Sequence, residues 1–186
     1  MPEGLERNGG MWYVIQTVGG QEQAVRALIE RQLSGARSEL VEQCFIPMRE
    51  RTIKRGGEWK LVQEKLFPGY VFVVTEDAQR LLQELKDFPR FMRLLGESGN
   101  GFVPLCAEEV DFIRRFEDSG HIARLSQVEV CEGRQIRVLS GALLNCEGMI
   151  TKVNLHKRVS QVRISFMGRP VDVFLGFELL GKPTDM

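Results

Sequence analysis

Between residues 65 and 74 the chain reads Lys65-Leu66-Phe67-Pro68-Gly69-Tyr70-Val71-Phe72-Val73-Val74. The Pro-Gly pair predicts a turn, because proline presets φ and glycine adopts backbone conformations that side chains disfavour. The β-branched and aromatic residues after the pair predict a strand. Its partner upstream is the run Met11-Trp12-Tyr13-Val14-Ile15-Gln16-Thr17, which Gly19-Gly20 and a helix follow.

Helices and strands alternate over the first part of the chain. The helical spacing of apolar residues predicts three helices, over residues 21–33, 76–86 and 107–116. In the first helix we expect the charged residues Glu22, Arg26, Glu30 and Arg31 to face water. Extended runs over 44–55 and 58–66 flank Gly56-Gly57 and predict a β-hairpin, and 91–95 suits a short strand. Helices interleaved with hairpins and crossovers indicate an α+β sandwich.

The pattern changes after Phe116. Residues 118–127 are mixed and non-periodic, which is typical of a linker. Short strands separated by turns follow and predict a small closed barrel, with strands over 135–139, 146–153, 159–166 and 171–175. We therefore expect a disordered extension over 1–10, a first domain over 11–117, the linker over 118–127 and a second domain over 128–186.

The composition argues against several classes of function. The 25 acidic and 25 basic residues balance, so nucleic-acid binding would require a local basic patch. No apolar stretch approaches the roughly 20 residues that span a membrane, and no signal peptide is recognised. The four cysteines are scattered, so we expect reduced thiols, no metal, no cofactor and a cytoplasmic protein. The two histidines, His121 and His156, have no catalytic motif around them, so we expect no enzyme.

Further motifs match one family in order along the chain. They are Met11–Thr17, Pro68-Gly69 with its strand, Asp87–Met92, Pro104-Leu105, Glu108–Val110, Glu132–Val138, Ser140-Gly141, Glu147-Gly148 and Met167–Val171. From about Met11 to Lys182 the chain resembles the NusG family of transcription factors. The resemblance implies an NGN domain, an antiparallel sheet flanked by helices, followed by a KOW domain, an SH3-like β-barrel. It also implies a monomer that binds RNA polymerase.

Within the family, the chain departs from RfaH. That paralog reads a DNA signal with basic residues, whereas the corresponding stretch Val18–Ala24 has no base-reading cation. The carboxy-terminal segments of the present chain are rich in Val, Ile and Phe, which favour strands over helix. The short linker and the composition of Arg49 to Lys60 look more like LoaP, an antitermination paralog. The alternative is a housekeeping NusG whose KOW domain binds Rho or a ribosomal protein.

The resemblance assigns polymerase binding to Phe67, Tyr70 and Phe72. In the family this strand builds an apolar cavity that docks on the clamp helices of RNA polymerase, and a helix in an apolar groove is a common recognition mode. Alternation alone would place Tyr70 and Phe72 on one face, which fits a plain core strand. With the resemblance, we expect at least two of the three to be exposed.

Two groups of basic residues are candidates for nucleic-acid binding. The first flanks the glycine turn around Trp59 and consists of Arg49, Arg51, Lys54, Arg55 and Lys60. Aromatic and cationic side chains together suit single-stranded nucleic acid, and the family hairpin lies near upstream DNA, but a solvated hairpin tip explains the same residues.

The second group surrounds one loop of the expected barrel. It consists of Lys152, His156, Lys157 and Arg158, with Arg134, Arg137, Arg163 and Arg169 on neighbouring strands. Cations on small barrels recognise RNA loops, which favours a nascent RNA hairpin as partner. The alternative is a solvated loop on a domain that contacts a protein.

Overall fold

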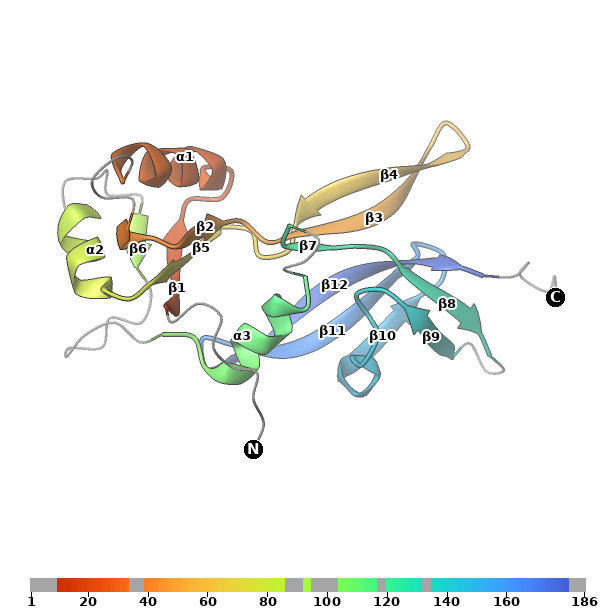
Figure 1. The fold of residues 1–186 in the computed structure, drawn as a ribbon. Coiled ribbons are helices and arrows are strands. Elements are labelled where there is room, and N and C mark those ends of the chain that lie inside the picture. The colour runs from red at the N-terminus through yellow and green to blue at the C-terminus, as the bar shows by residue number, and fades with distance from the viewer. Residues whose placement is uncertain are drawn as a thin grey trace. The chain divides into compact units, whose positions relative to one another are not determined.

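The computed structural model describes residues 10–33, 39–85, 92–94, 104–116, 120–131 and 135–180. The chain divides into two compact units (Figure 1). The first combines Met1–Ile46 with Pro68–Cys106, and the second combines Pro47–Phe67 with Ala107–Met186. The predicted extension, apart from Gly10, lies outside the described residues. The predicted domain boundary within 118–127 stays a prediction.

The first unit is built on a four-stranded antiparallel sheet in the order β2-β5-β1-β6 (Figure 1). Its strands are β1 (Met11–Thr17), β2 (Gln43–Phe45), β5 (Tyr70–Thr75) and β6 (Met92–Leu94). The two strands predicted from the Pro-Gly stretch and its upstream partner pair directly, with Val14 opposite Phe72. Both are central in the sheet, so apolar residues on both of their faces are buried.

Two helices accompany this sheet: α1 (Glu22–Gln32) and α2 (Ala78–Leu85). Their apolar spacing places Val25, Ile29 and Leu81 in the core. The core also contains an edge-on contact between Trp12 and Phe45, with ring centroids 5.4 Å apart. The predicted end of the second helix at 86 and the Pro89 after it lie outside the described residues.

A buried carboxylate supports the Pro68-Gly69 turn. Glu22, expected to face water, is fully buried, and its Oε1 accepts a hydrogen bond from the Gly69 amide at 2.7 Å. The Gly69 carbonyl accepts a further bond from the Thr17 amide at 2.8 Å. Gly69 has φ +86°, which explains the glycine at this position. The prediction for Glu22 was wrong because a turn amide binds its carboxylate.

The second unit contains the predicted hairpin. Strands β3 (Met48–Arg55) and β4 (Glu58–Lys65) pair in antiparallel register around Gly56-Gly57, and β7 (Ile122–Ala123) adds a parallel edge. The run predicted as one strand over 44–55 is divided into β2 and β3, with Ile46 and Pro47 between them. Proline cannot donate to a strand ladder, which explains the break.

The carboxy-terminal part of the second unit is a five-stranded curled sheet in the order β10-β11-β12-β8-β9 (Figure 1). Its strands are β8 (Ser126–Val130), β9 (Ile136–Ser140), β10 (Ile150–Asn154), β11 (Val159–Phe166) and β12 (Arg169–Leu179). The predicted strand over 146–153 begins as a 3₁₀ turn, η4 (Glu147–Met149), and β12 is longer than predicted. Strand β8 starts inside the predicted linker. Helix α3 (Ala107–Arg114) also belongs to this unit.

The hairpin base rests closely on the carboxy-terminal sheet within this unit. A Cβ added at Gly176 in β12 would lie 2.4 Å from the carbonyl oxygen of Glu50 and 2.9 Å from the Cα of Arg51. The Glu50 Oε2 accepts from the Leu125 amide at 3.2 Å, and Arg49 Nη1 donates to the Phe174 carbonyl at 2.7 Å. Only glycine permits this backbone approach.

The buried turn support gives a first prediction. Glu22→Ala leaves the Gly69 amide without its carboxylate partner, so we expect a loss of about 1.5–3 kcal/mol in the free energy of unfolding by denaturant titration. Glu30→Ala is the matched control, because the exposed Arg26–Glu30 pair at 2.8 Å contributes about 0.5 kcal/mol. Equal effects of the two substitutions would contradict the role of Glu22.

The cysteines give a second prediction. All four are thiols outside any disulfide; Cys106 and Cys131 are exposed, Cys44 is half-buried and Cys146 is buried. Burial, with a smaller contribution from the Glu30 carboxylate, raises the pKa of Cys44 to about 12 from an ordinary 9.0, and burial also raises the pKa of Cys146. At pH 8, Ellman's reagent should therefore modify two thiols rapidly and two slowly.

The same shift makes stability depend on pH. The folded state keeps the Cys44 proton that the unfolded chain loses above pH 9, so the Cys44 contribution is complete below pH 9 and declines toward pH 12. Cys44→Ala should reduce this decline in unfolding experiments. Four thiols of equal reactivity, or an unaltered pH dependence in the variant, would count against this account.

Candidate nucleic-acid interface and docking strand

The predicted docking residues are less exposed than expected. Phe72 is fully buried, because its strand lies between β1 and β2, and its ring stacks on Phe45 with centroids 5.7 Å apart. Phe67, in the second unit, is 2% exposed and stacks on Phe166 at 4.7 Å. Tyr70 is half-buried. The expectation that at least two of the three are exposed is therefore wrong in this structure.

The arginines at the hairpin base are engaged within the molecule. Arg49 Nη2 lies 2.9 Å from Glu64, and Arg51 Nε lies 3.2 Å from the same carboxylate. Arg49 also lies over the Phe174 ring, 5.6 Å from its centroid. Arg49 thus fixes the hairpin to β12, whereas Arg51 is held within the hairpin, and both arginines are less available to a ligand.

The cations at the hairpin tip are accessible to a ligand. Lys54, Arg55 and Lys60 are exposed, and no carboxylate of the described residues forms an ion pair with them. The strand register places Lys54 opposite Trp59, and residues directly opposite share a face of the hairpin. Arg55 is opposite Glu58 and Lys60 is opposite Ile53, so these two cations lie on the other face.

The predicted basic loop of the carboxy-terminal sheet is a well-defined turn between β10 and β11. The Lys157 amide donates to Asn154 Oδ1 at 2.8 Å, and the Arg158 amide donates to the Leu155 carbonyl at 3.3 Å. Arg158 has φ +51°, and its carbonyl accepts from the Phe177 amide at 3.0 Å. These backbone hydrogen bonds therefore fix the position of the Arg158 Cα, from which its side chain extends.

Three exposed polar side chains at this loop complete the second predicted group. Lys152, His156 and Lys157 are exposed, and none of them forms an ion pair with a carboxylate of the described residues. The loop thus presents side chains to solvent from a backbone held by hydrogen bonds.

One contact joins the two predicted basic groups. The Arg158 guanidinium carbon lies 4.1 Å from the centroid of the Trp59 ring, well within cation–π range. Trp59 nevertheless remains 37% exposed. Each group was predicted separately, because a contact between residues about a hundred positions apart has no signature in a single sequence.

The neighbouring arginines of the sheet are mostly neutralised. Arg137 pairs with Glu129, and Arg163 makes two hydrogen bonds to Asp172, of 2.9 and 3.1 Å. The bond to Arg163 lowers the pKa of Asp172. Arg169 is exposed, while the predicted Arg134 lies outside the described residues. Among the predicted basic residues that the structure describes, positive charge without an ion pair thus lies in the loop, at the hairpin tip and at Arg169.

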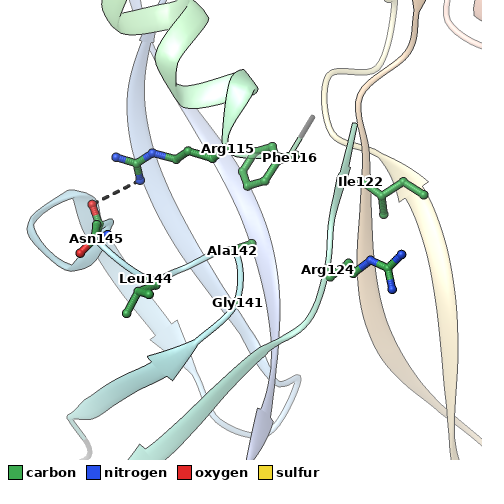
Figure 2. Close-up of a pocket in the computed structure, with 8 residues that line it drawn as sticks. All are labelled: Arg115, Phe116, Ile122, Arg124, Gly141, Ala142, Leu144 and Asn145. Atoms are coloured by element: carbon green, nitrogen blue, oxygen red, sulfur yellow. Dashed lines mark hydrogen bonds between the residues drawn. The ribbon is translucent and has the colours of Figure 1, made fainter. Parts of the chain in front are cut away.

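A cavity of about 410 Å³ lies elsewhere in the second unit (Figure 2). Its lining, which the sequence did not indicate, consists of Arg115, Phe116, Ile122, Arg124, Gly141, Ala142, Leu144 and Asn145. Arg115 Nη1 donates to the Asn145 carbonyl at 3.3 Å and lies 2.8 Å from the Cys146 sulfur. Figure 2 shows the Arg124 guanidinium extending away from Arg115, so the two cations do not converge on one ligand position.

No catalytic or metal-binding arrangement is found in the part of the chain that the structure describes. Groups of three or more His, Cys, Asp or Glu side chains that could hold a metal are absent from it. His121, with φ +61°, and the exposed His156 lie in separate turns. None of the described helices is long and apolar enough to cross a membrane.

Comparisons with known proteins agree with this architecture. The family described as "Transcription termination factor nusG" matches residues 10–114, which is more than half of the chain. The transcription termination/antitermination protein NusG of Pseudomonas aeruginosa is 33% identical over 92% of this chain and 97% of its own. The protein of the same name from Thermus thermophilus is 30% identical over 92% of this chain and 97% of its own.

Similarity to a solved structure concerns the fold. A structure of Thermotoga maritima NusG superposes with a TM-score of 0.55 and 23% identity, covering 89% of this chain and 93% of that one. The α+β fold, an antiparallel sheet with helices followed by a strand-rich curled sheet, is thereby confirmed. The chain belongs to the NusG family of transcription termination and antitermination factors, which are not enzymes.

Proposed function

We propose that this protein regulates transcription elongation by binding the clamp helices of RNA polymerase, and that it promotes processive antitermination. In this proposal the first unit holds the polymerase, and the carboxy-terminal sheet binds a nascent RNA hairpin. Preferential binding to the actively elongating polymerase would suppress pausing. The observation that carries the RNA part is the group of unpaired cations around the Trp59–Arg158 contact. The composition of Arg49 to Lys60 is the basis for proposing a specialised paralog resembling LoaP.

Tyr70 is the side chain best placed to carry polymerase affinity. It starts β5 directly after the Pro68-Gly69 turn and is half-buried, so part of its ring is accessible. Phe72 supports the strand from inside the core. Phe67 can contact a partner only when its ring leaves Phe166. Tyr70 is therefore the residue of the three that we expect to contribute most to polymerase binding.

A second candidate function has its own observation. Val130 and Leu139, on the adjacent strands β8 and β9, are exposed by 47% and 39%. Exposed apolar side chains on neighbouring strands suit a protein partner. They favour a housekeeping NusG whose carboxy-terminal sheet binds Rho or a ribosomal protein.

Polymerase binding is tested first through Tyr70. Tyr70→Ala removes an aromatic anchor and should weaken binding by about 2 kcal/mol, roughly 30-fold, in a titration with purified RNA polymerase. Tyr70→Phe keeps the ring and should bind nearly as well as the parent. A folded Tyr70→Ala variant with parental affinity would remove Tyr70 from the docking surface.

RNA binding is tested through its salt dependence. Each phosphate contact on a single strand contributes a slope of about 0.7 in log affinity against log salt. Combining Lys152→Ala, Lys157→Ala and Arg158→Asn should lower RNA affinity and flatten this slope, with polymerase binding retained. Asparagine is chosen at Arg158 because it tolerates the positive φ of that position.

The control for this variant removes the same charge from the first unit, by Arg26→Ala, Arg31→Ala and Arg80→Ala. It should leave the RNA salt slope unchanged. If the loop variant binds leader RNA and reads through terminators like the parent, the loop is ordinary solvated surface. The exposed Val130 and Leu139 would then favour the protein-binding alternative.

A further inference from the structure

The hairpin and the loop between β10 and β11 meet at a single aromatic–cation contact. Arg158 covers part of the Trp59 ring, with its guanidinium carbon 4.1 Å from the centroid. Because Trp59 remains 37% exposed, the ring retains accessible area beside the arginine. Leu61, on the same face of β4, is 57% exposed and extends the apolar surface. Such a surface suits the flat, apolar face of a nucleobase.

The charges around Trp59 are arranged unevenly. On its own face of the hairpin, Lys54 lies directly opposite the ring, and no described carboxylate pairs with it. On the other face, Arg55 lies opposite Glu58, and Arg51 pairs with Glu64. A nucleic-acid strand that lies along this face at Trp59 therefore meets the positive charge of Lys54, whereas Glu58 and Glu64 lie on the opposite face.

The two segments are held together by backbone rather than by flexible side chains. Gly176 lets β12 approach Glu50 and Arg51 of the hairpin at van der Waals limits. The next residue of β12, Phe177, donates its amide to the Arg158 carbonyl. Adjacent residues of one strand therefore position the hairpin and the loop, so that Trp59 and Arg158 are preorganised for a ligand.

We propose that Lys54, Trp59, Lys157 and Arg158 form one binding strip for an unpaired nucleic-acid strand. A base stacks on Trp59 and the Arg158 guanidinium, and Lys54 and Lys157 hold the phosphates on either side. The strip rests on the RNA-binding part of the proposed function and narrows it to unpaired nucleotides of the transcript or of the displaced DNA. A base-paired stem, whose bases are already stacked, binds less tightly.

The direct test follows Trp59 itself in the full-length protein. The chain has two tryptophans, so 5-fluorotryptophan labelling gives two ¹⁹F resonances, which Trp59→Phe assigns. Oligo(U) and oligo(dT) of 12 nucleotides should shift the Trp59 resonance and leave that of the buried Trp12 in place. A 12-base-pair duplex and inorganic polyphosphate should shift it little. Comparing oligo(U) with oligo(dT) distinguishes a transcript from a displaced DNA strand.

Affinity measurements on variants separate stacking from simple attraction of charge. Trp59→Ala should weaken oligonucleotide binding roughly 5- to 150-fold, the range for one base stacked on an aromatic ring, whereas Trp59→Phe should retain most of it. Lys54→Ala should weaken binding more than Lys60→Ala, although both remove one charge from the same hairpin. Equal effects of the two lysine substitutions would show that no strip is defined.

Gly176→Ala provides an independent arm, since it removes no charge and no aromatic ring. The new methyl group pushes the hairpin away from β12, so the affinity for oligo(U) should fall. Without oligonucleotide, the ¹⁹F resonance of Trp59 should shift toward its position in an Arg158→Asn variant, because the ring has lost the same contact. Parental affinity in Gly176→Ala and Trp59→Ala would overturn the strip. If the triple loop variant still loses RNA in that case, RNA binding by the carboxy-terminal sheet stands without it.

The remaining outcomes are also decisive. If the parent binds neither of the single-stranded oligonucleotides, the strip fails, whereas RNA binding by the carboxy-terminal sheet is judged by the leader RNA titrations and polymerase binding by the Tyr70 variants. If Trp59→Ala impairs antitermination without changing any oligonucleotide affinity, the strip is overturned and this surface serves a protein.

Discussion

The close backbone approach at Gly176 is the constraint on which the second unit depends. Strand β12 can lie against the carbonyl of Glu50 only because position 176 has no side chain. This approach brings Arg49 to the Phe174 carbonyl and Glu50 to the Leu125 amide, and it allows Trp59 to reach Arg158. The hairpin and the curled sheet, between which 60 residues intervene in the sequence, consequently act as one packed body.

Ion pairing then decides which of the many basic residues can meet a ligand. Arg49 and Arg51 share Glu64, and Arg163 is bound by Asp172, so these cations are largely neutralised in place. Lys54 and Lys157 have no such carboxylate among the described residues. A chain with no net charge can therefore present a positive surface, because its acidic residues are distributed unevenly over it.

Local patterns in the sequence were sufficient for most of the fold. The Pro68-Gly69 turn, the strand after it and the hairpin around Gly56-Gly57 follow from backbone preferences that act over a few residues, and the structure contains all three. Glu22 could not be predicted in this way, because its polar side chain is buried by a turn 47 residues away. Burial of Phe67 against Phe166 and the contact of Trp59 with Arg158 likewise depend on tertiary packing.

The way the chain passes between its two units affects how this protein can be taken apart. It leaves the first unit after Ile46, returns at Pro68 and leaves again after Cys106, so three peptide connections join the units. No single cut separates them. A carboxy-terminal fragment starting at Val128 would lack the hairpin and α3, leaving the Phe166 ring and the bare backbone at Gly176 uncovered. Truncation would thus expose apolar surface that promotes aggregation. Point substitutions in the intact chain avoid this exposure, so they assign activities to either unit more directly.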